Sequence, residues 1–179
     1  MKVISQVALL FCCILLHAQN LYKGQGNVMF ISDAPLEVIR AESKQLDGIL
    51  NLSKMQFAFK INVSSFDGFN SGLQKEHFNE HYLETEKYSD ATFTGKLILD
   101  EDCFSDCSTS GISKGKLNIH NETQIVSIPV SFSIKNEKIY LSSQFSILLA
   151  DFNIKIPRIV ESKIAPEIDV VVEIEMKKL

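Results

Sequence analysis

The residues best suited to chemistry in this chain are two histidines and a glutamate that lie close together. His77, Glu80 and His81 fit the pattern H-x-x-E-H, in which two histidines on one helical face ligate zinc and the glutamate acts as a base. A third ligand would have to come from elsewhere in the chain. With 179 residues the chain is far shorter than the peptidases that use this pattern, so a chance match on a solvated helix is favoured. We predict no enzyme, no catalytic residues, no metal and no cofactor, with a metal-dependent hydrolase as the less favoured alternative.

A second group with possible chemistry is the pair Cys103 and Cys107, which lies in an acidic, serine-rich segment with Asp100, Asp102 and Asp106. In an exported protein such a pair favours a local disulfide. Free thiols and a metal site stay open, although a lone cysteine pair without a histidine partner is weak evidence for zinc. No nucleophile elbow, dinucleotide fingerprint or phosphate-binding loop occurs in the chain.

The first residues have the character of an export signal. Lys2 provides a positive start, residues 7–16 are apolar without interruption, and the small Ala18 suits a cleavage site. The apolar run is shorter than the about 20 residues that span a membrane. We therefore predict a signal peptide at residues 1–18, a single domain at 19–179 with no integral membrane span, and a periplasmic or secreted location.

Two further sequence features argue against lipidation and against binding of nucleic acid. Cys12 and Cys13 raise the alternative of a lipoprotein, but the bulky Phe11 stands where a lipidation signal needs a small residue. The net charge is −4, and no block of basic residues occurs. The sequence therefore predicts no nucleic-acid partner.

Alternation of apolar and polar side chains recurs along most of the remaining sequence. In residues 124–135, for example, apolar Ile128, Val130 and Phe132 are separated by Pro129 and Ser131. Successive side chains of a strand point to opposite faces, so each such segment has one face to bury. A sandwich or a closed barrel would satisfy all of them. Strands are expected at residues 27–32, 36–42, 46–52, 55–63, 91–99, 113–120, 124–135, 138–149 and 168–177.

The connections complete an all-β, mainly antiparallel fold. Asn121-Glu122 and Asn136-Glu137 are two-residue links of the kind that join antiparallel strands, and His120 beside the first is expected to be solvated. Residues 71–88 have helical periodicity, with Ser71 as the cap, and predict one short amphipathic helix. Residues 152–166 are expected to form a crossover loop with a short strand at 152–156.

Three motifs, in order, resemble the YceI-like family. They are residues 77–95 (HFNEHYLETEKYSDATFTG), residues 115–121 (GKLNIHN) followed by Ile128-Pro129-Val130, and residues 145–154 (FSILLADFNI). Two departures lie in turns: Ser89-Asp90 stands where the family usually has a proline, and Asn121 where it usually has glycine. The resemblance implies a lipocalin-like closed barrel, exported in bacteria, whose interior in some members holds a polyisoprenoid or a similar long apolar molecule.

The inward apolar positions are the candidate ligand contacts. We expect an apolar lipid such as a polyisoprenoid or fatty acid to be carried or sequestered there without chemical change. The alternative is a barrel filled by side chains that acts as a structural or protein-interaction module. The oligomeric state is open, with a homodimer among the options. The predicted lining consists of Met55, Phe57, Phe59, Ile61, Phe93, Leu97, Val126, Ile128, Val130, Phe132, Leu141, Phe145 and Ile147.

Overall fold

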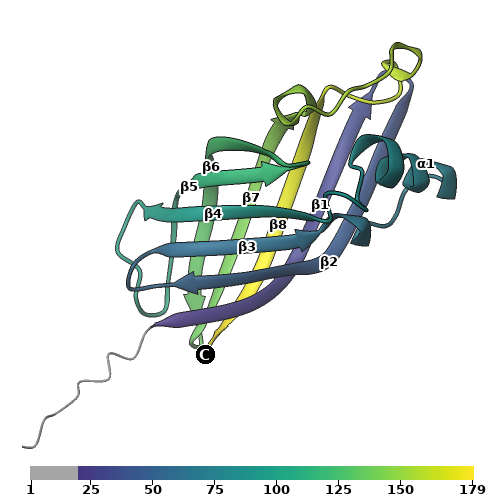
Figure 1. Ribbon diagram of the computed structural model, residues 1–179. Helices are drawn as coiled ribbons and strands as arrows, with labels where there is room; N and C mark the ends of the chain where they lie inside the picture. Colours follow the sequence, from purple (N-terminus) through teal and green to yellow (C-terminus); the bar gives the residue numbers. More distant parts are fainter. Residues whose placement is uncertain (1–19) are drawn as a thin grey trace, which may run out of the picture.

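Eight antiparallel strands, each paired with its neighbours in chain order, close into a barrel in the computed structural model (Figure 1). Pairing of the first strand with the last completes the closure. This confirms the predicted closed, antiparallel, lipocalin-like class. The strands are β1 (Leu21–Ala34), β2 (Glu37–Asn51), β3 (Gln56–Asn62), β4 (Asp90–Leu99), β5 (Cys107–Ile119), β6 (Glu122–Lys135), β7 (Lys138–Leu148) and β8 (Glu167–Lys178).

The structure describes residues 20–179. The predicted signal peptide at residues 1–18, and the lipoprotein alternative at Cys12 and Cys13, lie outside this part of the chain. Within it, no helix has both the length and the apolar character that crossing a membrane requires.

The alternation read from the sequence corresponds to the inner and outer faces of the barrel wall. Along β6, Ile128, Val130 and Phe132 are buried, whereas the intervening Pro129 and Ser131 are exposed. Apolar burial is therefore concentrated inside the barrel, as the period of two requires.

The first part of the wall differs from the sequence prediction. Residues 36–42 and 46–52, expected as two strands, form the single long strand β2. The pairing register shifts near its middle, because Gly26 of β1 faces Leu46 whereas Val28 faces Ser43. The buried hydroxyl of Ser43 contacts the Ser65 hydroxyl at 2.6 Å and accepts a hydrogen bond from the Gln45 N–H. The one extra residue of β2 at this point makes a β-bulge, which does not end the strand.

Other boundaries are also corrected. β3 begins at Gln56, because Met55 lies in a turn with φ of 53°. Residues 152–156, predicted to hold a short strand, do not form one: the 3₁₀ helix η3 (Leu149–Phe152) ends there, and a left-handed Asn153 follows it. A second 3₁₀ helix, η4 (Arg158–Val160), lies further along the crossover, and η1 (Val63–Ser65) follows β3.

The predicted helix at 71–88 is shorter than its periodicity indicated. It consists of α1 (Gly72–His77) and a π-helical turn, η2 (Phe78–Tyr82). The Ser71 cap is confirmed, since its side chain accepts a hydrogen bond from the Gln74 N–H at 3.2 Å. A helix this short is stabilised mainly by what it packs on, which here is the barrel.

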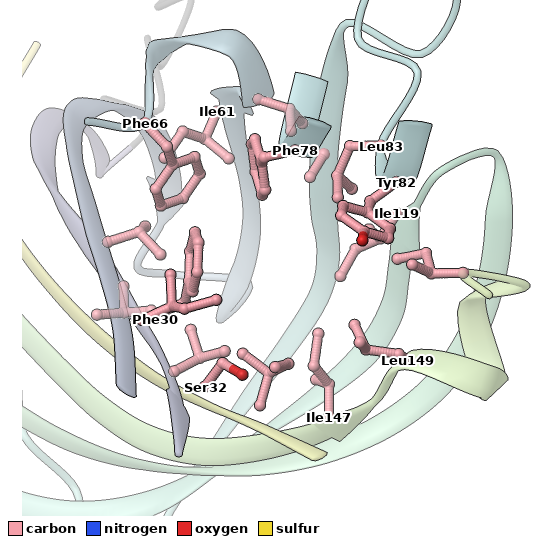
Figure 2. A pocket seen from close by; sticks show the side chains of 18 of the residues that line it. Phe30, Ser32, Ile61, Phe66, Phe78, Tyr82, Leu83, Ile119, Ile147 and Leu149 are labelled. Atoms are coloured by element: carbon pink, nitrogen blue, oxygen red, sulfur yellow. The ribbon is translucent and has the colours of Figure 1, made fainter. Parts of the chain in front are cut away.

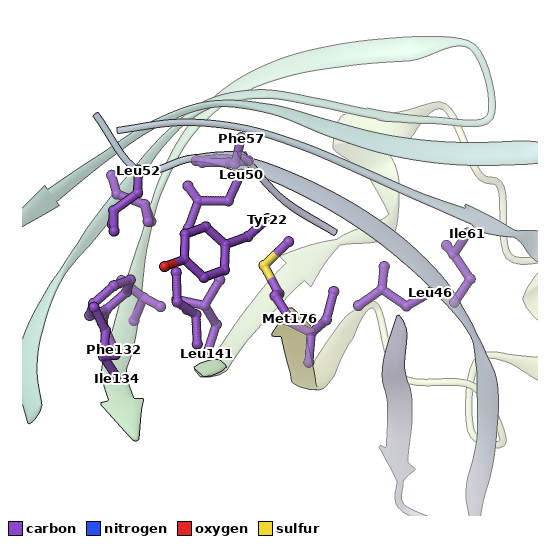
Figure 3. Packing of buried hydrophobic residues seen from close by; sticks show 14 of the residues in the cluster. Tyr22, Leu46, Leu50, Leu52, Phe57, Ile61, Phe132, Ile134, Leu141 and Met176 are labelled. Atoms are coloured by element: carbon purple, nitrogen blue, oxygen red, sulfur yellow. The ribbon is translucent and has the colours of Figure 1, made fainter. Parts of the chain in front are cut away.

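One end of the barrel is filled with side chains, as Figure 3 shows. This filled end carries the turns 52–55 and 136–137, the loop 100–106 and both ends of the barrel's chain. Phe132 is 1% exposed there, and Cys103 is 2% exposed. The buried residues that fill it include Tyr22, Leu50, Leu52, Phe57, Leu97, Phe132, Ile134, Ile139 and Met176.

The loop at the filled end is closed by a disulfide between Cys103 and Cys107, whose Cα atoms are 5.7 Å apart. Cys103 packs into the buried cluster, so the disulfide holds one side of the loop against the barrel interior.

Reduction of this disulfide is expected to lower the free energy of unfolding by about 2 kcal/mol, the loop-entropy value for a very short loop. Urea unfolding with and without reductant measures the change. The Cys103→Ala/Cys107→Ala variant is the control and should not respond to reductant. Equal unfolding midpoints for the oxidised and reduced wild-type protein would contradict the prediction.

An apolar cavity under a helical lid

The other half of the barrel contains a cavity of about 550 Å³. Figure 2 shows side chains from the two sides of the wall facing an open centre. The lining is almost entirely apolar, with contributions from the strands and from the segments that cover the barrel mouth. Small side chains, including Ser32, Ala91 and Ser113, stand among the lining residues where larger ones would fill the space.

The structure separates the predicted lining residues into two groups. Those that line the cavity are Phe59, Ile61, Phe93, Ile128, Val130, Leu141, Phe145 and Ile147. Phe57, Leu97 and Phe132 pack in the filled end instead. Met55 packs against the filled end from its turn, and Val126 packs against a smaller cluster that contains Phe152. Alternation along each strand correctly predicted which side chains face the barrel interior. It does not indicate how far along the barrel axis a residue lies.

Between the two groups lies the floor of the cavity. Phe59 stacks on Phe57 of the filled end, with ring centroids 5.0 Å apart and an interplanar angle of 19°. Leu46, Leu141 and Ile174 belong both to the buried core cluster and to the cavity lining. A molecule that enters from the mouth therefore meets these side chains before it reaches the filled end.

Over the mouth lies a lid, formed by residues 63–83 between β3 and β4. Its apolar core is a group of four aromatic rings that the sequence analysis did not identify. Phe78 of the lid stacks on Phe30 of β1, with centroids 5.5 Å apart and an interplanar angle of 14°. Phe66 and Phe69 contact the same two rings. The helical periodicity of residues 71–88 could indicate that the Phe78 side chain is buried. It could not indicate that the ring stacked on Phe78 comes from β1.

Polar contacts hold the lid at its edge. Asn70 and Gln74 each donate a side-chain hydrogen bond to Glu37 at the start of β2, both at 3.2 Å. Asp67 exchanges backbone hydrogen bonds with Glu42, and its carboxylate accepts from Lys75 at 3.2 Å. The Lys75 ammonium group holds the pKa of Asp67 below its usual value. Burial from solvent raises the pKa of Tyr82.

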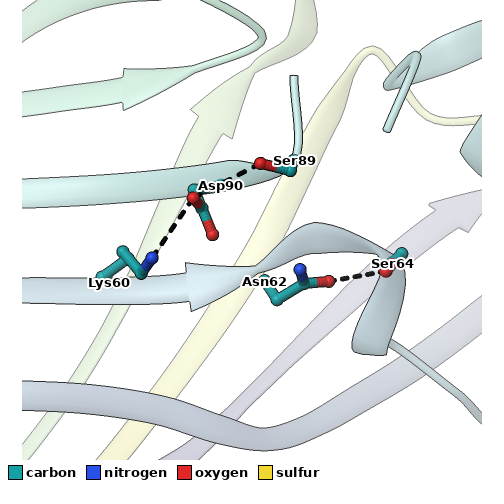
Figure 4. Close-up of polar contacts among 5 residues, drawn as sticks. All are labelled: Lys60, Asn62, Ser64, Ser89 and Asp90. Carbon is teal, nitrogen blue, oxygen red and sulfur yellow. Dashed lines mark hydrogen bonds and ion pairs between the residues drawn. The ribbon is translucent and has the colours of Figure 1, made fainter. Parts of the chain in front are cut away.

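The connection that contains the lid leaves the end of β3 and returns beside it at the start of β4 (Figure 4). The Val63 N–H donates to the Ser89 carbonyl at 2.8 Å. Nearby, Lys60 pairs with Asp90 at 3.3 Å, and the Ser89 hydroxyl donates to the same carboxylate. Ser89-Asp90, which departs from the family pattern, thus supplies polar contacts that a proline could not make.

The barrel wall is not fully paired at the mouth. β6 bonds to β7 only over Ser131–Lys135, so the two strands separate above that point, as Figure 1 shows. Helix η3 covers this opening, with Phe152 nearly completely buried beneath it. Gln124 of β6 donates to the Asp151 carbonyl at 2.7 Å and holds η3 in place.

His120 connects the residues that follow the lid to this covering segment. Its Nδ1 is 3.2 Å from the Phe152 carbonyl, its Nε2 is 2.9 Å from a Glu84 carboxylate oxygen, and its ring contacts Tyr88 edge-on. The expectation that His120 is solvated was wrong, since its side chain is only 10% exposed. The positive φ values of His120 and Asn121 are typical of a two-residue turn and can be predicted from the local sequence. The hydrogen-bond partners of His120 cannot, because they come from distant segments.

The two histidines of the zinc-like motif lie in different environments. His77 is half-buried and lines the cavity mouth, which corrects its expected position on a solvated face, whereas His81 and Glu80 are exposed. The two imidazole rings are 5.3 Å apart. Among residues 20–179, no group of three histidine, cysteine or acidic side chains is close enough to hold a metal ion.

Fold and cavity together define a class: closed eight-stranded barrels with an internal apolar chamber, open toward a helical lid. The YceI-like domain matches residues 21–176, and the chain belongs to this family. No curated protein sequence is significantly similar to the chain.

Solved structures share the fold at low sequence identity. A polyisoprenoid binding domain from Saccharophagus degradans, implicated in plant cell wall breakdown, has 13% identity and a TM-score of 0.73, covering 88% of this chain and 98% of that one. BcnA of Burkholderia cenocepacia has 16% identity and a TM-score of 0.71, covering 84% and 95%. The YceI protein of Campylobacter jejuni has 17% identity and a TM-score of 0.58, covering 76% and 84%.

His120→Ala removes the hydrogen bonds that join Glu84, next to the lid, to Phe152 of η3. At about 0.5–1.5 kcal/mol for each hydrogen bond, the free energy of unfolding should fall by about 1–3 kcal/mol. Release of a fluorescent fatty-acid probe, followed by stopped flow, should become faster. His81→Ala, which changes an exposed histidine of the same lid, is the control. Equal release rates in the two variants would show that His120 does not hold the lid.

Phe132→Ala and Phe59→Ala test the boundary between filled end and cavity. Phe132→Ala leaves a void in packed surroundings and should cost about 3–5 kcal/mol of unfolding free energy. Phe59→Ala extends a space that already exists, so the stability loss should be smaller, and native mass spectrometry should detect a shift toward longer bound chains. Equal destabilisation, with no change in chain-length preference, would mean that Phe59 belongs to the packed core.

Proposed function

We propose that this protein is an exported carrier that holds a long apolar molecule, such as a polyisoprenoid or a fatty acid, in the mouth half of its barrel. The molecule is stored or transported without chemical change. The observation that carries this proposal is the cavity of about 550 Å³, lined by apolar side chains and covered by aromatic ones. Chambers of a few hundred Å³ with such linings are typical sites for small apolar ligands.

Two comparisons support the choice of ligand class. The chain belongs to the YceI-like family, and a structural relative is described as a polyisoprenoid binding domain. Export itself rests on the sequence of residues 1–18 and on the disulfide, which is typical of oxidising compartments.

The free energy of binding would come mainly from buried area. At about 25 cal/mol per Å², a few hundred Å² of apolar ligand surface gives on the order of several kcal/mol, from which the cost of ordering a flexible chain is subtracted. Polar groups near the mouth, such as Glu37, Gln74 and Lys163, are placed where the polar end of an amphiphile would lie.

Native mass spectrometry of protein purified from its own host, followed by organic extraction, tests the proposal. We expect a bound apolar molecule that the extraction removes, and uptake of a fluorescent isoprenoid or fatty-acid analogue by the emptied protein. Phe78→Ala, which removes the central ring of the lid, should weaken that uptake, whereas Phe104→Ala, an exposed ring in the disulfide loop, should not.

Absence of any bound molecule, together with failure of the emptied protein to take up either probe, would overturn the carrier proposal. Stoichiometric zinc in the purified protein, with a hydrolytic activity lost in His77→Ala/His81→Ala, would favour the hydrolase alternative instead.

A further inference from the structure

Large apolar side chains are exposed around the mouth of the barrel. Ile159 of η4 is 89% exposed, Leu36 in the β1–β2 turn is 72% exposed, and Leu73 of α1 is 60% exposed. Each comes from a different segment. Exposed apolar side chains are ordinary when scattered singly, so what matters is whether these three belong to one surface.

Hydrogen bonds join the three segments into one structure. The Leu36 N–H donates to the carbonyl of Ser162, which connects the β1–β2 turn to the crossover, at 2.9 Å. The side chain of Gln74 in α1 reaches Glu37, the first residue of β2. We call the surface made by Leu36, Leu73 and the crossover residues 153–165 the mouth rim.

The crossover part of the mouth rim is also cationic. The crossover residues 153–165 contain Lys155, Arg158 and Lys163, all exposed, against the single acid Glu161, although the whole chain has a net charge of −4. None of the ion pairs found among residues 20–179 involves these three cations. Their charge is therefore available to an external anionic partner.

The same surface is continuous with the cavity. Leu73 of α1 and Val160, Lys163 and Ile164 of the crossover are among the residues that line it. A partner seated on the mouth rim would thus cover the entrance to the chamber, whereas a partner on the outer wall would not.

We propose that the mouth rim docks on the surface of a bilayer that contains anionic lipids. Ile159, Leu36 and Leu73 enter the interfacial layer, while Lys155, Arg158 and Lys163 lie at the level of the lipid phosphates. Exposed apolar residues interleaved with cations are what binding to such an interface requires. The inference extends the proposed function, on which its purpose rests: a docked mouth lets an apolar molecule move between bilayer and cavity without crossing water.

Co-sedimentation with vesicles of phosphatidylcholine and phosphatidylglycerol tests the docking directly. The wild-type protein should bind these vesicles more strongly than pure phosphatidylcholine, and salt should weaken the binding. Lys155→Gln/Arg158→Gln should reduce the vesicle partition coefficient by about 10- to 30-fold, at roughly fivefold for each basic residue near the surface. Lys23→Gln/Lys135→Gln, which removes two exposed cations elsewhere on the barrel, gives the same net charge and should change it less than twofold.

A second pair of variants tests the apolar part. Ile159→Ser should weaken vesicle binding several-fold, whereas Ile98→Ser, at an exposed position on β4, should not. All four variants change exposed side chains, and thermal melts should confirm that they fold like the wild-type protein.

Uptake of a fluorescent fatty acid in vesicle-free solution separates this inference from the proposed function. The rim variants should take up the probe normally. If the wild-type protein binds vesicles but takes up no probe, the carrier function is overturned and the docking proposal still stands. Lack of vesicle binding by the wild-type protein, or equal losses of binding in the rim and control variants, would overturn the docking proposal. Binding of a protein to the rim in place of vesicles would overturn it as well.

Discussion

The inward apolar face of eight paired strands is the constraint on which the rest of the structure depends. An eight-stranded barrel is just wide enough either to be filled by its own side chains or to hold a small ligand. In this chain the choice changes along the barrel axis. Large residues such as Tyr22, Phe132 and Met176 fill one end, whereas Ser32, Ala91 and Ser113 leave a chamber in the other. Both ends of the barrel have the same eight-stranded backbone, and the volume of the inward side chains determines where the packed core ends and the cavity begins.

The chamber would be open to water without segments that lie outside the regular wall. Residues 63–83 cover the mouth, and η3 covers the opening where β6 and β7 separate. Neither cover is a strand of the barrel wall, although Asp67 of the lid exchanges backbone hydrogen bonds with Glu42 of β2. They are held by aromatic packing around Phe78 and by the contacts of His120 with Glu84 and Phe152. Aromatic packing and polar contacts therefore position the two covers, while the apolar lining beneath them encloses the chamber.

How much of this could be predicted depends on the range of the interactions. The inner face of β6 followed from alternation, and the Ser71 cap from local chemistry, because both are encoded within a few residues. The bulge at Ser43 did not, since its hydroxyl contacts Ser65 across the fold. The sequence also does not indicate that Phe57 lies in the filled end while Phe59 lines the cavity, or that His120 is buried. Both depend on tertiary contacts that no local pattern encodes. Fold and inner face were thus predictable, but the floor and the covers of the cavity were not.

The closing seam of the barrel joins its first and last strands, since Tyr22 of β1 pairs with Lys178 of β8. A contact between residues so far apart in sequence is slow to form. The barrel cannot close until the last strand is available, and before then β1 and β7 present unpaired edges to other chains. The unclosed barrel is therefore the form that is exposed to edge-to-edge association, and a truncation within β8 would leave the barrel in that form.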